Sequence, residues 1–517
     1  MWTKSGQQPK VKMKKIIISD NPWQTRIAVT RDKKIQNIYF ASHAIQTLER
    51  SFFKGIITKV LPGIQTAFVD IGQERAGFLH ISEIDRELAF KKVEDLSAEV
   101  SDRETKKTRR PRRQSVDISK ILKENEPILV QVSKEPIYEK GAKLTTCFTI
   151  PGRFIVLMPN IPRIGISKKV ESREERSRLR ELVQKNLPTG MGAIIRTTSE
   201  NQKEKDIVQD IKFLIKTWRS INRKFKQAEP KERIHDDLPI AMQVVRDHLD
   251  EDVDEIISNN KKTQKEVFQF VKNIAPEHSH KVKLHKEPPM LFEQFGLEKQ
   301  INAGLYKKVE LKSGGSLIIE TTEAMTVIDV NTGKFVGKKS MQDTILKTNL
   351  EAAEETVRQL RFRNIGGLIV IDFIDMTSSA HRQQLIRTFE KTLKERDKFQ
   401  SVVLKVSEFG LVQMTRKRSG KTLTQQLTHN CPTCRGSGFV KSPQTESYSI
   451  LESVKKDLLG DKKLRGKLEI RVSPAQLEHI TDIEYNSILD LEKDFKSEIT
   501  LSGLASLTAD RYKIEKK

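Results

Sequence analysis

Two aspartates interrupt strand-like apolar runs in the second half of the chain. Asp329 lies in the run Thr-Val-Ile-Asp-Val, and Asp372 lies in the run Leu-Ile-Val-Ile-Asp-Phe. Aspartate is disfavoured in buried strands, because its β-propensity is low and because its charged side chain is rarely buried. A buried carboxylate without a partner costs several kcal/mol, so we expect a cation to face each of them.

A hard divalent cation is the natural candidate. Mg²⁺ prefers one or two carboxylates together with water and substrate phosphate, which leaves positions open for a phosphodiester. Asn331 is expected on the same strand face as Asp329, where it would support the site. Asp375 would face the opposite side of a continuing strand, so we expect a structural role for it. Alternatively, the aspartates cap strand ends or pair with arginines such as Arg358, Arg361 or Arg363.

The sequence around the two aspartates predicts the strands and the helix that position their carboxylates. Residues 316–335 have the pattern of a hairpin, residues 350–363 that of an amphipathic helix, and residues 366–376 that of a buried strand. This order of strand, crossover helix and strand brings the two aspartate-bearing strands together.

A second candidate site is the pair Cys431 and Cys434, which has the spacing of a zinc knuckle. Structural zinc needs four ligands, and only His429 lies nearby, with Cys147 far away in the sequence. The simplest completion is a second subunit that supplies its own pair. A redox disulfide is the alternative, although the motif lies outside a thioredoxin-like strand and helix setting.

Composition indicates a polyanionic partner and a reducing compartment. The 517 residues include 93 Lys and Arg against 69 Asp and Glu, a formal charge of +24. Nucleic acid is the first candidate partner and an anionic membrane surface the second. No apolar run approaches the roughly 18 residues of a spanning helix, and the N-terminus lacks the apolar centre of a secretion signal. Three cysteines in so long a chain favour the cytoplasm.

A small antiparallel barrel is predicted at residues 55–79, where strand-like alternation is broken by two glycine-containing turns. An OB-type barrel is the economical interpretation. Its Phe68 and Phe78 either stack on RNA bases or fill the barrel core. Residues 106–114 are strongly basic and are expected to form a solvated insert, and residues 1–12 an unstructured extension.

Three motifs resemble the ribonuclease E/G family in its order and nearly its spacing: residues 321–331, 348–376 and 431–438. The resemblance begins at about Met13 and fades toward the C-terminus. It implies that Asp329 and Asp372 bind one Mg²⁺, that Asn331 supports attack by activated water, and that the products carry 5'-phosphate and 3'-hydroxyl ends. It also implies a shared zinc held by the two cysteines of each of two subunits.

The resemblance extends to residues that would contact RNA. Phe68 and Phe78 match the family's stacking phenylalanines, and Lys140 matches an RNA-contacting lysine. The resemblance also implies a sensor that binds the 5'-monophosphate of the substrate. Arg196 and Thr197 match its phosphate-binding residues, and Gly152 and Val156 match the residues that line the first nucleotide. Lys168 stands where the family commonly has an arginine.

An arginine fork suits a terminal phosphate. The alternative is that Arg196 forms an ordinary surface salt bridge. A further sensor arginine of the family has no clear counterpart near residues 398–400.

The fold class implied is a multidomain α/β (α+β) protein: an RNase H-like subdomain with an inserted OB-fold barrel and 5' sensor, a DNase I-like catalytic subdomain, a zinc link and a small C-terminal domain. The expected boundaries are 1–12 for the extension, 13–50 and 239–304 for the RNase H-like parts, 51–146 for the barrel with its basic insert near 100–115, 147–238 for the sensor, 305–427 for the catalytic subdomain, 428–441 for the zinc link and 442–517 for the C-terminal domain.

The expected function is therefore endonucleolytic cleavage of single-stranded, A/U-rich RNA, stimulated by a 5'-monophosphate, in processing of the 16S ribosomal RNA 5' end and in messenger decay. The expected partners are these RNAs and further copies of the chain, as a dimer or a dimer of dimers. The chain resembles the short form of the family, with no evident scaffold for a degradosome. The alternatives are a non-catalytic RNA- or ribosome-binding protein and a DNA nuclease.

Overall fold

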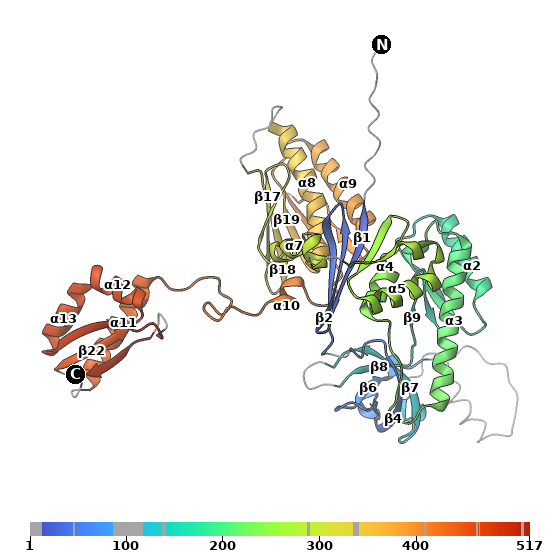
Figure 1. Cartoon of the computed structure of the whole chain (residues 1–517), viewed down its shortest axis with the longest axis horizontal. Coiled ribbons are helices and arrows are strands. Elements are labelled where there is room, and N and C mark those ends of the chain that lie inside the picture. The colour runs from blue at the N-terminus through green and yellow to red at the C-terminus, as the bar shows by residue number, and fades with distance from the viewer. Residues whose placement is uncertain are drawn as a thin grey trace, which may run out of the picture. The chain divides into compact units, whose positions relative to one another are not determined.

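The computed structural model describes residues 13–44, 47–85, 117–136, 141–286, 290–333, 341–407, 410–461, 464, 466–507 and 511–517. The predicted extension, the basic insert and Lys140 lie outside these residues. The chain divides into two compact units, Met1–Gln426 and Leu427–Lys517. The architecture is mixed α/β, as predicted (Figure 1). None of the described helices is long and apolar enough to cross a membrane.

The first sheet joins strands from the chain's start with strands more than 200 residues later. Its order is β15-β14-β1-β2-β3, with β1 parallel to β14 and antiparallel to β2. Separate apolar clusters lie on its two faces, one with α4 and α5 and the other with α6, α7 and the end of α8. The elements are β1 (Lys14–Asn21), β2 (Gln24–Arg31), β3 (Lys34–Ser42), β14 (Val253–Ser258), β15 (Val282–Leu284), α4 (Ile240–His248), α5 (Lys261–Ile274), α6 (Leu291–Gln294) and α7 (Leu297–Ala303).

A closed five-stranded barrel follows β3, which confirms the predicted OB-like barrel. Its strands pair in the order β4-β5-β6-β8-β7, and β4 also pairs with β7 to close it. Its interior is filled by aliphatic side chains that include Ile57, Val69 and Val130. The strands are β4 (Phe52–Leu61), β5 (Thr66–Asp70), β6 (Gly77–His80), β7 (Pro127–Lys134) and β8 (Lys143–Thr145).

A four-stranded sheet of order β11-β12-β10-β9 packs against α2 and α3. The buried carboxylate of Asp210 on α3 accepts hydrogen bonds from the backbone N–H groups of Arg153, Phe154 and Ile155. After α3, strand β13 (Arg233–His235) pairs with β4 of the barrel. The other elements are β9 (Ile150–Pro151), β10 (Ile155–Met158), β11 (Ile164–Ile166), α2 (Arg173–Asn186), β12 (Gly192–Ile195), the 3-10 turn η4 (Thr197–Ser199) and α3 (Glu204–Gln227).

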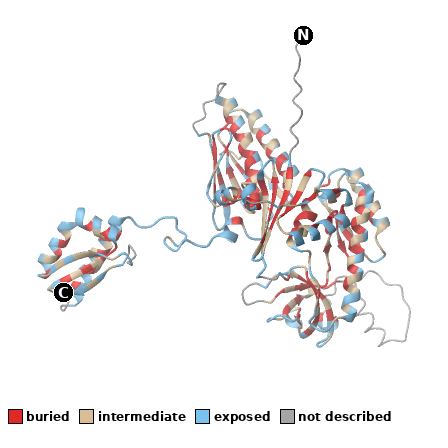
Figure 2. Ribbon diagram, in the orientation of Figure 1, coloured by how far each residue is buried: buried red, intermediate tan, exposed pale blue. Residues whose placement is uncertain are grey.

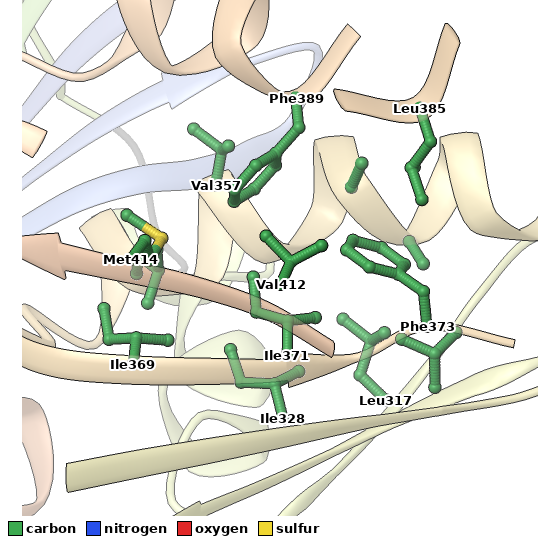
Figure 3. Close-up of a cluster of buried hydrophobic side chains, with 14 of the residues drawn as sticks. Leu317, Ile328, Val357, Ile369, Ile371, Phe373, Leu385, Phe389, Val412 and Met414 are labelled. Carbon is green, nitrogen blue, oxygen red and sulfur yellow. The ribbon is translucent and has the colours of Figure 1, made fainter. Parts of the chain in front are cut away.

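The predicted strand, helix, strand unit forms the centre of a six-stranded sheet of order β16-β17-β18-β19-β21-β20. Strands β18 and β19 are parallel neighbours, and α8 and α9 cover one face of the sheet (Figure 3). The elements are β16 (Lys308–Glu310), β17 (Ser316–Thr321), β18 (Met325–Asn331), α8 (Met341–Phe362), β19 (Gly367–Asp372), α9 (Ser379–Arg396), β20 (Ser401–Val403) and β21 (Leu411–Arg416), followed by α10 (Leu423–Leu427).

The other face of this sheet is open. Burial alternates strictly along β18, and buried residues concentrate under the helices (Figure 2). Our expectation that Asp329 and Asp372 are buried is wrong, because both aspartates lie on the open face and are exposed.

The second unit has a three-stranded sheet of order β23-β22-β24, in which β22 is parallel to β23 and antiparallel to β24. Its helices and sheet share one apolar core. The elements are α11 (Pro443–Gly460), β22 (Lys467–Val472), α12 (Pro474–Asp482), α13 (Tyr485–Phe495), β23 (Glu498–Gly503) and β24 (Lys513–Lys516).

The substitution Arg416→Met is expected to destabilise the first unit by about 3 to 5 kcal/mol. Arg416 and Asp397 form a two-bonded ion pair in which the two side chains are 1% and 2% exposed, so the change leaves a buried carboxylate unpaired. Denaturant unfolding measures the loss. The matched control is Lys307→Met, which breaks an exposed pair with Glu320 and should cost less than about 1 kcal/mol. Equal effects of the two substitutions would refute this explanation.

Candidate functional site

The carboxylates of Asp329 and Asp372 are brought together by strand pairing. The two residues stand opposite each other in the register of β18 and β19, where both strands approach their C-terminal ends. Asn331 lies on the same face of β18, and its amide donates a hydrogen bond of 2.8 Å to Asp329 Oδ2. The three polar side chains thus form a compact group on the open face of the sheet.

The loop after β19 is fixed from beneath by α8. Asn349 on α8 is fully buried, and its side-chain amide bonds both the carbonyl oxygen and the N–H of Ile374, at 2.8 and 3.1 Å. Because Ile374 follows Asp372 by two residues, Asn349 positions the end of the strand that carries the carboxylate. Asn349 was not predicted as a site residue, although it lies within the motif at residues 348–376, because its bonds to Ile374 depend on how the helix packs on the strand.

Burial and the negative charges of Asp329 and Asp375 raise the pKa of Asp372. Asp375 is therefore near enough for its charge to contribute to this shift. The alternation rule does not apply to Asp375, because β19 ends at Asp372. The site gathers negative charge that a bound cation would relieve.

The arginines that offered an alternative have other partners. Arg358 bonds Glu355 and the backbone carbonyl of Ile35. Arg361 bonds the side chains of Gln36 and Asn37. Arg363 bonds the side chain of Gln359. No lysine, arginine or histidine among the described residues forms an ion pair with Asp329 or Asp372. The arginine-pairing alternative is thus wrong for the described part of the chain.

The donor set fits a hard divalent cation. Two carboxylates and a neighbouring amide are oxygen-rich, as Mg²⁺ requires, and the exposed position leaves coordination sites for water and substrate. Within the described ranges, no cluster of three or more His, Cys, Asp or Glu side chains offers a metal site. An all-protein cage, which Ca²⁺ or structural zinc would favour, is therefore absent from those ranges.

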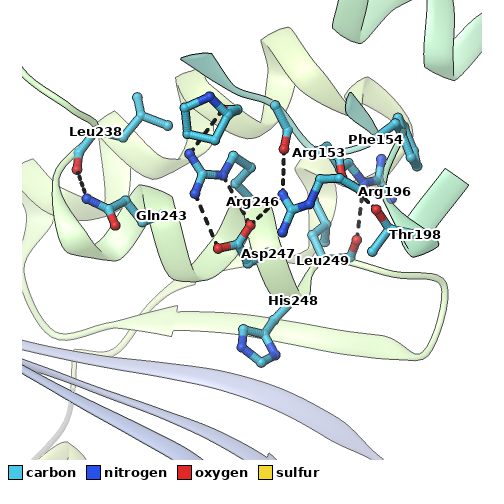
Figure 4. Close-up of polar contacts among 12 residues, drawn as sticks. Arg153, Phe154, Arg196, Thr198, Leu238, Gln243, Arg246, Asp247, His248 and Leu249 are labelled. Carbon is cyan, nitrogen blue, oxygen red and sulfur yellow. Dashed lines mark hydrogen bonds and ion pairs between the residues drawn. The ribbon is translucent and has the colours of Figure 1, made fainter. Parts of the chain in front are cut away.

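Arg196, at the end of β12, is held by two hydrogen bonds from Nη1 (Figure 4). The acceptors are the carbonyl oxygen of Gly152 at 2.6 Å and Asp247 Oδ1 at 2.8 Å. Among the described residues Nε and Nη2 have no bonding partner, so they remain available to a ligand. Burial opposes ionisation of Asp247, but the charges of Arg246 and Arg196 outweigh it and lower the pKa of Asp247 to about 2.

A cavity of about 910 Å³ opens beside Arg196 and Thr197. Lys169 and Lys398 also line it, and neither was predicted as a site residue. Lys169 donates to two backbone carbonyls, at 2.8 Å each, and Lys398 donates to the carbonyl of Asp247. Cationic side chains outnumber acidic ones around the cavity, which suits an anionic group. The other cationic lining residues are Lys14, Arg31, Arg361, Lys394, Arg396 and Lys417, and the acidic ones are Asp250, Asp252, Glu395 and Asp397.

The other predicted sensor residues lie around this region with different local roles. The Thr197 hydroxyl is 2.9 Å from that of Ser167, and Val156 is half-buried on β10. A side chain at Gly152 would clash with Asp210, at 2.5 Å from its Oδ2, so packing alone requires this glycine. Lys168 is exposed and is not among the residues that line the cavity.

Phe68 and Phe78 face each other directly across strands β5 and β6. Both are half-buried, whereas their neighbours Ala67, Val69 and Leu79 fill the barrel core. The two rings therefore lie on the outer side of the barrel, and the core-packing alternative is wrong.

Cys431 and Cys434 are free thiols in a turn-rich segment ahead of α11. Hydrogen bonds from the backbone N–H groups of Cys434 and Thr433 lower the pKa of Cys431. Cys147 lies in the other unit, and burial raises the pKa of its thiol. One chain thus presents two thiols of a possible four-ligand site.

Comparison with known proteins adds independent information. The model of the ribonuclease E/G family matches residues 149–419. The chain belongs to the ribonuclease E/G family. Ribonuclease G of Escherichia coli K12 is 35% identical over 477 residues, which cover 92% of this chain and 94% of the relative. Ribonuclease G of Haemophilus influenzae is 37% identical over 440 residues, 85% and 86% of the two chains. Ribonuclease E of Escherichia coli K12 is 34% identical over 451 residues, 86% of this chain and 41% of the relative.

A second model of the family, described as its thioredoxin-like domain, matches residues 430–517. We had predicted a small C-terminal domain without identifying its fold. The thioredoxin-like match includes the cysteines, but they precede α11 and do not stand between a strand and a helix of the domain. The second unit carries the parallel pair β22 and β23, with α12 and α13 between them in sequence.

The low pKa of Asp247 predicts an acid-dependent loss of stability. A carboxyl whose folded pKa lies below its unfolded value stabilises the fold above about pH 4, and that contribution is lost as pH falls through 2. The free energy of unfolding of the wild type should fall by about 2 kcal/mol more than that of Asp247→Asn between pH 5 and pH 2. Parallel pH profiles of the two proteins would contradict the assignment.

Proposed function

We propose that the chain is an endoribonuclease that hydrolyses single-stranded, A/U-rich RNA with Mg²⁺ and leaves 5'-phosphate and 3'-hydroxyl ends. The observation that carries this proposal is the pair Asp329 and Asp372, held in register on an open sheet face without a cationic partner among the described residues. Membership of the ribonuclease E/G family and the similarity to ribonuclease G support it.

Asp329 and Asp372 would hold the Mg²⁺, and each has a distinct environment. The Asn331 amide fixes the orientation of the Asp329 carboxylate through its hydrogen bond. Asn349 keeps the backbone after Asp372 in place. Bound Mg²⁺ would stabilise charge on the scissile phosphate and lower the pKa of water. The exposed face lets an RNA strand reach these groups without a conformational opening.

Substrate bases would stack on Phe68 and Phe78. Paired rings on the outside of a barrel provide π-faces that any base can use, worth about 1 to 3 kcal/mol per base. Lys140 is proposed as an additional RNA contact on the strength of the family resemblance alone.

The 5'-monophosphate of the substrate would bind at Arg196 and Thr197. The free Nε and Nη2 of Arg196 can form a charge-assisted pair of bonds to phosphate oxygens. Gly152 and Val156 would line the first nucleotide, and Lys168 would add charge from outside the cavity. The cationic lining of the cavity supports an anionic occupant.

Cys431 and Cys434 would bind a structural Zn²⁺ together with the same pair of a second copy. Two thiolates from each chain complete a tetrahedral site. The assembly would be a homodimer or a dimer of such dimers.

The subdomains would correspond to an RNase H-like part, an OB-fold barrel, a 5' sensor, a DNase I-like catalytic part and a zinc link. The enzyme would act in the cytoplasm on ribosomal RNA precursors, at the 5' end of 16S RNA, and on messenger RNA.

Asp329→Asn and Asp372→Asn are each expected to abolish internal cleavage of a 5'-monophosphorylated A/U-rich RNA while leaving RNA affinity within about twofold. Each change removes a metal ligand and leaves the RNA-contacting residues intact. The matched control is Glu320→Gln, which neutralises an exposed carboxylate on the neighbouring strand β17. Gel analysis of the products measures cleavage, and filter binding measures affinity.

Two outcomes would contradict the proposal. If the wild type binds RNA but never cuts it, the protein is a non-catalytic RNA-binding protein. If it cuts single-stranded DNA of the same sequence as well as RNA, the substrate class is wrong.

Zinc analysis is expected to find one Zn²⁺ for every two chains, and Cys431→Ser should remove both the metal and the dimer. The reason is that one chain supplies only two of the four ligands. Elemental analysis and light scattering measure the two effects, with Cys147→Ser as the control. A metal-free wild-type dimer would refute the shared site.

A further inference from the structure

Helix α3 carries six exposed cations on one face. They recur every three, four or seven residues, so that at 3.6 residues per turn they fall within about a quarter of the helix circumference. This basic stripe consists of Lys205, Lys212, Lys216, Arg219, Arg223 and Lys226. It extends for roughly 32 Å along the helix axis, at 1.5 Å per residue.

The opposite face of α3 is the one that packs into the fold. It buries Ile207, Ile211, Leu214, Trp218 and Ile221 against the four-stranded sheet. The basic stripe is therefore not required for packing.

The charge of the stripe is not neutralised by the protein. No acidic side chain among the described residues forms an ion pair with any of the six cations. The acidic residues of α3 lie outside the arc of the stripe, and Glu204 instead pairs with Arg178. Six like charges in a row repel one another, so a polyanion that spans them would be bound favourably.

Helix α3 runs between the two regions that would contact RNA. Helix α3 begins shortly after Thr197, which lines the cavity. At its other end the carbonyl of Ala228 accepts a hydrogen bond of 2.7 Å from Lys54 of the barrel strand β4. Figure 1 shows α3 on the outer side of the first unit, running from the four-stranded sheet to the barrel.

We propose that the basic stripe of α3 binds the phosphate backbone of a single-stranded RNA substrate, independently of its sequence, outside the catalytic site. This inference rests on the proposed RNA substrate and adds a binding surface to it. From Lys212 to Lys226, neighbouring cations of the stripe lie about 4.5 to 6 Å apart along the axis, and Lys205 lies about 10.5 Å before Lys212, given the rise of the helix. Such a row can neutralise successive phosphates of one strand. Long substrates would reach the stripe, whereas a short RNA held at the barrel would not.

The test compares the variant K212Q/K216Q/R219Q with the control K261Q/K265Q/K272Q, which removes three exposed lysines from α5. Both are made in full-length Asp372→Asn protein, so that RNA is bound but not cut. Affinity is measured over a range of salt concentrations for a short RNA of about 8 nucleotides, within the site size of one barrel, and for a several-fold longer one. Circular dichroism checks that the variants are folded.

The stripe variant should bind the long RNA on the order of tenfold more weakly. Its dependence of log affinity on log salt should be shallower by roughly 2, since each phosphate contact on a single strand contributes about 0.7. The short RNA and the α5 control should be unaffected. The inference is overturned if the stripe variant matches the control, or if it weakens both RNAs equally. If the parent protein binds neither RNA, the proposed function itself fails, which is a separate result.

Discussion

The parallel register of β18 and β19, which sets Asp329 opposite Asp372, is the constraint on which the candidate site depends. Two like charges on free backbones would separate, and here burial, together with the negative charges of Asp329 and Asp375, raises the pKa of Asp372. The parallel pairing of β18 and β19 prevents that separation. It is stabilised in turn by the apolar side chains packed between the sheet and helices α8 and α9. Cation binding would relieve the repulsion between the two carboxylates.

The rest of the first unit anchors this sheet. Arg358 and Arg361 on α8 bond β3 of the first sheet, which ties the helix beneath the carboxylates to a second layer. The buried pair of Arg416 and Asp397 joins β21 to the segment after α9. Lys169 from the four-stranded sheet region bonds the same segment, so the segment after α9 borders both the cavity and the six-stranded sheet.

Local pattern predicted the strand, helix, strand unit and the barrel because both depend on short-range alternation and turn signals. It failed for the exposure of Asp372, since the continuous apolar run of β19 is typical of a strand covered on both faces. In this structure Leu368 lies on the open face and is 41% exposed. The roles of Asn349, Lys169 and Lys398 were also beyond prediction, because each depends on contacts between segments far apart in the chain. The thioredoxin-like domain carries no local chemical motif that could have identified it.

The assignment of Asp329 and Asp372 as metal ligands can be tested by counting bound metal ions. Electron paramagnetic resonance can count tightly bound Mn²⁺, used in place of Mg²⁺, in the presence of single-stranded RNA. We expect one Mn²⁺ site in the wild type, from which Mg²⁺ displaces the Mn²⁺ and which disappears in both Asp329→Asn and Asp372→Asn. Retention of that site in both variants, or its absence from the RNA-bound wild type, would contradict the assignment of these two carboxylates as the catalytic metal ligands.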